Sequence, residues 1–226
     1  RGVSPGQAPI RAGPTAGSIG SPGNAKNVLT AGASENVQAF GGGDGCGTTD
    51  TQANSAMDIV PFSSRGPCGD GRRKPDLMAP GTHVAGGVAQ ANGQQAEPPA
   101  IATGQALACF NASGVCAGPG GTDFWPLGQQ WYTASSGTSH STPAVAGGAA
   151  LLRQYFINQG RTPPSPAMTK AYLLGAARYM TGTGANDSLP SNNQGMGLMD
   201  LGVAFDGTPR LVEDQAPASL FTASGQ

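Results

Sequence analysis

The sequence contains few charged side chains. Lysine, arginine, aspartate and glutamate together make up 11% of the 226 residues, and the formal net charge is −1. There is no run of like charges, so nothing indicates binding to nucleic acid or to an anionic membrane surface. Every apolar stretch is interrupted by Gly, Arg or Gln well short of the length that crosses a bilayer. We therefore expect neither a nucleic-acid partner nor a membrane span.

Side chains that bind metal ions or move protons are also scarce. The only histidines are His83 and His140, and the cysteines lack the Cys-x-x-Cys spacing of a zinc site. No cluster of carboxylates indicates calcium, so neither a metal nor another cofactor can be assigned. The four cysteines are Cys46, Cys68, Cys109 and Cys116. An even number in Gly- and Ser-rich loops favours disulfides, and hence a secreted, extracellular protein. Of the three possible connectivities, Cys46–Cys68 with Cys109–Cys116 is favoured.

Glycine, by contrast, is abundant. The chain has 37 glycines, whereas glycine makes up about 7% of an average protein. The glycines have no period of three, which excludes a collagen-like repeat. This composition predicts a fold with many tight turns and close approaches between backbone segments.

Short apolar segments predict strands, and two longer segments predict helices. Residues 25–34 are typical of a short buried strand, and Asp76–Ala79 form a second compact apolar segment between two prolines. Residues 139–159 predict the strongest helix, and their apolar positions cover most of its circumference, which indicates burial on all sides. Residues 165–180 predict another helix, with Ser165 as its N-cap and proline at its first position.

Two further stretches have neither a helical nor a strand period. The first, about residues 84–134, is interpreted as an insertion within a domain that covers residues 1–206. The second, residues 207–226, contains Pro and Ser and is interpreted as a linker toward a following domain.

Ser139 stands at the start of the strongest predicted helix, within the stretch "SSGTSHSTPAVAGG". The N-terminus of a helix carries a partial positive charge and unpaired N–H donors. A serine at this position can act as an N-cap, or its own backbone N–H can stabilise an oxyanion formed at its side chain. Position alone leaves both interpretations open.

Four segments resemble, in the same order, the subtilisin-like serine proteases, or subtilases. They are "GSIGSPGNAKNVLTAGAS" (17–34), "FSSRGP" (62–67), "KPDLMAPGT" (74–82) and "GTSHSTPAVAGGAALL" (137–152). The resemblance implies an α/β fold with three layers, in which a mostly parallel sheet lies between helices. The chain is most similar to the C-terminal part of the catalytic domain of alkaline subtilases that carry an additional C-terminal β-sandwich domain.

The resemblance also assigns roles to individual residues. It implies that Ser139 is the nucleophile and that the hydroxyl of Thr138 supports the oxyanion hole. It further implies that one turn walls the pocket for the substrate side chain before the scissile bond (P1), and this turn comprises Ser21, Pro22 and Gly23. Asp76 matches a carboxylate that in some relatives lies near a weak cation site, but one carboxylate is too few ligands for a metal.

The other catalytic groups of the family are not found in this chain. His83 lies in "GTHVAGGVA", but Pro80 occupies the position of the family's catalytic histidine. His140 adjoins Ser139, and neighbours on a helix point to different sides. The aspartate motif and the oxyanion asparagine also have no counterpart.

We therefore expect a secreted endopeptidase that forms an acyl-enzyme at Ser139 and cleaves polypeptides. Its Asp, His and Asn would come from polypeptide upstream of Arg1, either as a second chain or as a missing segment, so this chain alone is expected to be inactive. The alternatives are a non-catalytic subtilase-like scaffold and a structural domain in which Ser139 is only a cap.

Overall fold

The computed structural model describes residues 15–37, 53–87, 123–124 and 132–216. Two parallel strands form its centre, β1 (Ala31–Ser34) and β2 (Leu77–Pro80). Ala31 pairs with Leu77, and the register continues to Ser34 and Pro80. Both strands are short, and β1 consists of small residues. Glycine at position 32 lets the backbone of β1 lie against a methionine side chain of β2. A parallel α/β arrangement, as expected from the sequence, is confirmed.

Strand β1 is shorter than the predicted strand over residues 25–34. Residues 25–30 instead form turns and irregular chain that lead into the strand. Asp76 N–H and Leu77 N–H both donate hydrogen bonds to the carbonyl of Thr30. These bonds hold the irregular segment against the start of β2, next to the first pair of the parallel ladder between β1 and β2.

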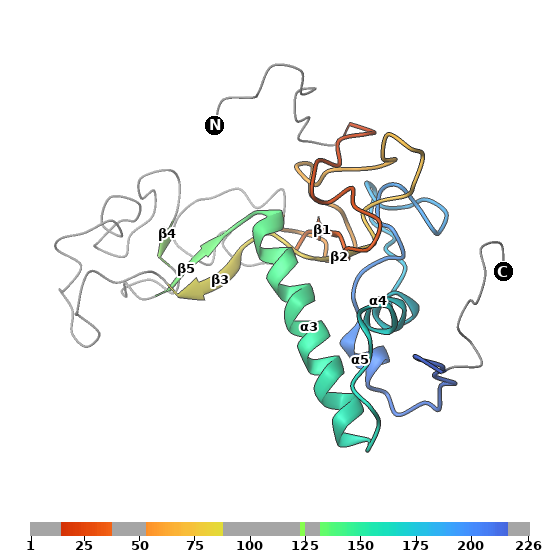
Figure 1. Ribbon diagram of the computed structural model, residues 1–226. Helices are drawn as coiled ribbons and strands as arrows, with labels where there is room; N and C mark the ends of the chain where they lie inside the picture. The colour runs from red at the N-terminus through yellow and green to blue at the C-terminus, as the bar shows by residue number, and fades with distance from the viewer. Residues whose placement is uncertain (1–14, 38–52, 88–122, 125–131, 217–226) are drawn as a thin grey trace.

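Helix α3 (Thr138–Asn158) confirms the helix predicted over residues 139–159. The prediction that the helix is buried on all sides is wrong for the part of the chain that the structure describes. Its buried positions follow a spacing of three to four residues and are Ser141, Val145, Gly148, Leu152 and Phe156. The side chain of Leu151 is 54% exposed. The described elements β1, β2 and α4 all lie against the buried face, which leaves the opposite face open (Figure 1).

Helix α4 (Pro166–Gly175) begins as the sequence predicts and ends earlier. Ser165 is the N-cap, and its hydroxyl accepts a hydrogen bond from the N–H of Met168 at 3.1 Å. The chain leaves the helix after Gly175 because Arg178 exchanges two backbone hydrogen bonds with Leu198, at 2.7 and 2.8 Å. This pairing replaces the last turn of the predicted helix over residues 165–180.

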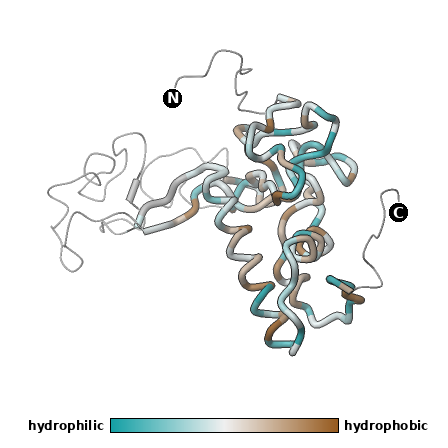
Figure 2. The backbone as a smooth tube through the Cα atoms, viewed as in Figure 1, coloured by the Kyte–Doolittle hydropathy of each residue, from teal (hydrophilic) through white to brown (hydrophobic). Residues whose placement is uncertain are grey.

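A cluster of apolar side chains joins α3 to α4 and to the short helix α5 (Leu201–Ala204). Leu152, Phe156 and Leu173 form its buried centre. The ring of Phe156 meets the ring of Tyr172 edge to face, with 5.5 Å between centroids. Figure 2 shows apolar residues on both α3 and α4 where the two helices lie side by side. Burial of such side chains stabilises a fold by about 1.5–3 kcal/mol each.

Three antiparallel strands lie beside the N-terminal end of α3 (Figure 1). They are β3 (Val84–Gly87), β4 (Asp123–Phe124) and β5 (Tyr132–Ser135), in the order β3-β5-β4. Val84 pairs with Ser135, so the two ends of the predicted insertion come together as a ribbon. Residues 88–122 and 125–131 lie outside the described residues, and the predicted domain limits remain a prediction.

Residues 207–216, within the predicted linker, pack on the helices. Val212 lies against the cluster formed by α3 and α4. The Asp214 carboxylate accepts hydrogen bonds from the N–H and the hydroxyl of Ser165, at 2.7 and 2.6 Å. These bonds hold the segment against the first turn of α4.

Acid should release this segment. Hydrogen bonds from the side chain and backbone of Ser165 lower the pKa of Asp214 below its ordinary value of 3.8. A carboxyl whose pKa is lowered on folding stabilises the contact above its ordinary pKa, and that contribution is lost as the pH falls through the lowered value. We expect protection of the Ser165 amide against hydrogen exchange to fall as the pH drops below 3.8 and through the lowered pKa of Asp214.

Asp214→Asn is the control for the acid release. The substitution should lower the protection of the Ser165 amide at every pH. It should also remove the pH dependence of that protection, because the asparagine side chain at position 214 does not titrate. An unchanged pH profile in this variant would contradict the assignment.

Candidate active site

Close packing fixes the N-terminal end of α3 above the carboxyl ends of β1 and β2. Gly137 donates a backbone hydrogen bond to the carbonyl of Gly81 at 2.7 Å, and Gly81 donates to the carbonyl of Ser34 at 2.9 Å. A Cβ atom at Gly81 would lie 2.5 Å from Ala33 Cβ and 2.6 Å from Ser141 Oγ. The chain therefore requires glycine at position 81, since no side chain fits between β1 and α3. In open α/β sheets, ligands bind outside the carboxyl ends of the strands.

Ser139 is the second residue of α3 and is exposed. The N-cap is Gly137, which makes no side-chain cap hydrogen bond, so the interpretation of Ser139 as the N-cap is wrong. Among the described residues, none forms a hydrogen bond with the Ser139 hydroxyl. The N-terminus of a helix carries a partial positive charge, so the Ser139 hydroxyl lies beside partly positive backbone donors.

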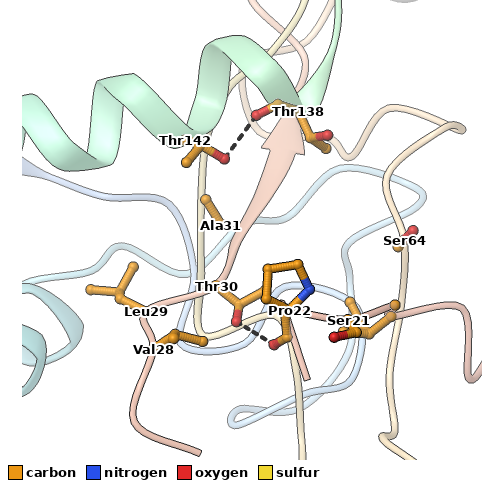
Figure 3. A pocket seen from close by; sticks show the side chains of 12 residues that line it. Ser21, Pro22, Val28, Leu29, Thr30, Ala31, Ser64, Thr138 and Thr142 are labelled. Carbon is orange, nitrogen blue, oxygen red and sulfur yellow. Dashed lines mark hydrogen bonds between the residues drawn. The ribbon is translucent and has the colours of Figure 1, made fainter. Parts of the chain in front are cut away.

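A cavity of about 430 Å³ opens next to Thr138 (Figure 3). One wall is the turn Ser21–Gly23, together with Ile19 and Gly20, and the other is formed by the first turn of α3. The remaining lining residues are Val28, Leu29, Thr30, Ala31, Ser64 and Thr142. The structure thus brings together the turn and the helix start that the sequence analysis singled out as pocket wall and nucleophile segment.

Eight of the twelve lining residues were given no site role in the sequence analysis, among them Val28, Ser64 and Thr142. Val28 and Ser64 line the cavity only because chain turns bring them there. Thr142 lies one turn after Thr138 on the same face of α3, and its hydroxyl donates to the carbonyl of Thr138 at 3.0 Å. The spacing of four residues on a predicted helix was the available signal for Thr142.

Neither histidine is hydrogen-bonded to Ser139 in the described part of the chain. His83 lies between β2 and β3, has a positive φ of 49°, and donates its backbone N–H to Ser136 Oγ at 3.1 Å. His140 follows Ser139 on the helix and donates its backbone N–H to the carbonyl of Gly137 at 3.0 Å. The structure gives neither residue the role of the base.

Asp76 lies just before β2 and is surrounded by lysines. Its carboxylate is 2.6 Å from Lys74 Nζ and 2.8 Å from Lys170 Nζ, and it accepts the N–H of Thr30 at 2.7 Å. In this structure ammonium groups occupy the positions around Asp76 that a cation would take, so the resemblance to a weak cation site does not carry over. No group of three or more His, Cys, Asp or Glu side chains suited to a metal occurs among the described residues.

Cys68 is a buried free thiol in the structure, so the predicted disulfide between Cys46 and Cys68 is not formed there. Its predicted partner, Cys46, lies outside the described residues, as do Cys109 and Cys116. The pairing of Cys109 with Cys116 remains a prediction. Within the described ranges, no helix is both long enough and apolar enough to pass through a bilayer.

Comparison with known proteins agrees with this geometry. The model of the subtilase family, peptidase S8, matches residues 10–197. The chain therefore belongs to the subtilase family of serine proteases and has the subtilisin-like fold.

Two curated relatives come from Dictyostelium discoideum, the serine protease/ABC transporter B family proteins tagB and tagD. They are 28% identical to the chain over 158 and 147 residues, which cover 64% and 59% of it. The chain spans 7% of the length of each.

Solved structures of proteases are also similar. The prenylagaramide maturation protease PagA is 22% identical, with a TM-score of 0.48, and the match covers 86% of this chain and 47% of that one. Fervidolysin from Fervidobacterium pennivorans is 24% identical, with a TM-score of 0.46. The match covers 83% of this chain and 20% of fervidolysin. The chain thus spans less than half the length of these proteins.

The packing at Gly81 can be tested with a matched pair of glycine substitutions. Gly81→Val should destabilise the fold by about 1–3 kcal/mol and displace the start of α3, because overpacking forces backbone shifts. Gly86→Val is the control, because a Cβ there has open space. Thermal denaturation measures the loss of stability, and labelling of Ser139 by a fluorophosphonate probe in the complete protein that contains this chain measures the displacement of the helix. Equal behaviour of the two variants would contradict this account of the packing.

Proposed function

We propose that the chain carries the nucleophile and part of the P1 pocket of a serine endopeptidase. Ser139 Oγ attacks the carbonyl carbon of the scissile peptide bond while a base removes its proton. The tetrahedral intermediate collapses to an ester on Ser139, and the amine leaves with the proton from the base. Water then hydrolyses the ester by the same steps. The observation that carries the proposal is the exposed Ser139 at the N-terminus of α3, directly after Thr138, which lines the 430 Å³ cavity.

The oxyanion of the intermediate would lie near the first N–H groups of α3. Donors directed at the developing charge are worth about 3–4 kcal/mol each in such sites. Thr138 precedes Ser139 and lines the cavity, which supports a role for its hydroxyl at the oxyanion. The wall Ser21–Gly23 would contact the P1 side chain.

The base, the aspartate that orients it and an oxyanion asparagine would come from polypeptide other than this chain. The proposal is supported by the position of His83 and His140, neither of which is hydrogen-bonded to Ser139 among the described residues. Without the base, turnover should fall by about a millionfold, which is the loss known for subtilisin itself. The chain alone should therefore be inactive, and its partner should be the N-terminal part of the same enzyme. A secreted enzyme is part of the proposal, and its remaining support is the predicted pair Cys109 and Cys116, because Cys68 is a free thiol.

Labelling with a fluorophosphonate probe tests the nucleophile. The complete protein that contains this chain should be modified at Ser139, because an activated hydroxyl attacks phosphorus as it attacks a carbonyl. Ser139→Ala should abolish both labelling and hydrolysis, whereas replacement of the exposed Ser188 by alanine should change neither. Mass spectrometry of the labelled peptide locates the adduct. A protein that binds peptides but is never modified would instead be a non-catalytic scaffold.

The lining of the cavity predicts the substrate side chain. Its described residues are apolar or carry hydroxyl groups, with no Asp, Glu, Lys or Arg among them. Burying a charged P1 side chain there would leave the charge without a partner, which is costly. We expect kcat/KM for a peptide with Leu at P1 to exceed that of a matched peptide with Lys or Glu by about 100-fold or more. A preference for charged P1 residues would contradict the proposed pocket.

A further inference from the structure

A cluster of two lysines and one aspartate lies behind the wall of the cavity. Lys74 is 2% exposed. Its Nζ donates to the carbonyl of Val28 at 3.0 Å, to Thr30 Oγ1 at 3.0 Å and to Asp76 Oδ2 at 2.6 Å. An ammonium has three protons, so these bonds use its full donor capacity.

Lys170 reaches the same cluster from α4. Its Nζ donates to the carbonyl of Val28 at 2.9 Å and is 2.8 Å from Asp76 Oδ1. The side chain of Lys170 is 25% exposed, so it closes the cluster from the solvent side. The carbonyl of Val28 thus accepts hydrogen bonds from two ammonium groups on two different elements.

Charge neutralisation does not account for the second lysine. Lys74 already pairs with Asp76, and a second ammonium beside the first is subject to like-charge repulsion. What Lys170 adds is a charge-assisted bond to the carbonyl of Val28. Such bonds are shorter and stronger than those between neutral groups.

The cluster is connected directly to the cavity wall. Val28 and Thr30 both line the cavity. Thr30 Oγ1 accepts from Lys74 and donates to the carbonyl of Gly23 at 2.6 Å, which joins the two sides of the wall (Figure 3). Residues 25–30 have no strand ladder to hold them. The positions of Val28 and of the turn at Gly23 therefore depend on these polar contacts.

We propose that Lys170 is a positioning residue for the P1 pocket, acting from α4 through the carbonyl of Val28. This inference rests on the proposed function, because it takes the cavity as the P1 pocket. Lys170 does not line the cavity. It fixes the wall segment in the position that a large P1 side chain contacts, and a small P1 side chain that does not reach Val28 does not depend on it.

Peptide binding without catalysis tests this role. The complete protein that contains this chain, with Ser139→Ala, is titrated by calorimetry with two peptides that differ only in Leu or Ala at P1. Lys170→Met removes the ammonium and keeps most of the side-chain length. We expect it to weaken binding of the Leu peptide by roughly tenfold, because losing the contact of about one methylene group in an apolar pocket costs about 10-fold or more. Binding of the Ala peptide should change by less than about twofold.

Two further variants complete the experiment. Lys170→Arg keeps a cationic donor and should restore most of the preference for Leu. Lys26→Met removes an exposed lysine of the same segment that does not line the cavity, and it should leave both affinities unchanged. Thermal denaturation of each variant shows whether it remains folded. A purely structural role would lower both affinities together and would not separate the two peptides.

The outcomes distinguish this inference from the proposed function. Equal weakening of both peptides by Lys170→Met, or no weakening, overturns the role of Lys170 while the protease assignment stands. In another outcome, Lys170→Met weakens binding of the Leu peptide alone, while the protein with Ser139 intact hydrolyses no peptide. That result supports the positioning role of Lys170 and overturns the proposed protease activity. If the complete protein binds neither peptide, both are overturned.

Discussion

The contact between Gly81 and its neighbours is the constraint on which the site depends. The end of β1, the end of β2 and the start of α3 approach so closely there that no Cβ atom fits. Gly81 also takes part in two backbone hydrogen bonds at this contact, because it accepts from Gly137 N–H and donates to the carbonyl of Ser34. Because the helix cannot slide or tilt without breaking these contacts, its second residue, Ser139, is held at one place above the carboxyl ends of the strands. A residue without a side chain is thus required at position 81, because the position of Ser139 depends on this close contact.

The cavity wall is held differently, by polar groups. A strand would satisfy its backbone through a ladder, but residues 25–30 are irregular and their carbonyls need other partners. Lys74 supplies three hydrogen bonds from a buried position, and Asp76 accepts from Thr30 N–H as well as from the two lysines. Removing one member of such a network leaves the others buried without partners, which costs more than the net strength of the bond. The cavity wall is therefore held by polar contacts, whereas the start of α3, with Ser139, is held by close packing.

Much of this arrangement could be predicted from the sequence where the signals are local. The start of α3 and the N-cap Ser165 depend on short local motifs. The turn Ser21–Gly23 lines the cavity, and its role as the P1 pocket wall stays a prediction. Features set by distant segments could not be predicted. Helix α4 ends early because Arg178 pairs with Leu198, and Asp76 pairs with Lys170 across 94 positions of sequence. Periodicity showed that α3 is apolar around its circumference, but which face the described elements cover depends on topology.

Placement and activation of Ser139 have separate physical origins. The contacts that place its hydroxyl lie within this chain, at Gly81, Gly137 and Ser141. Activation requires a proton acceptor in line with the hydroxyl, and the described residues provide none. An exposed serine hydroxyl is well solvated and unreactive, so its position alone stabilises no transition state. In the proposed mechanism, the gain in rate would come when a proton acceptor meets a hydroxyl that is already held in place.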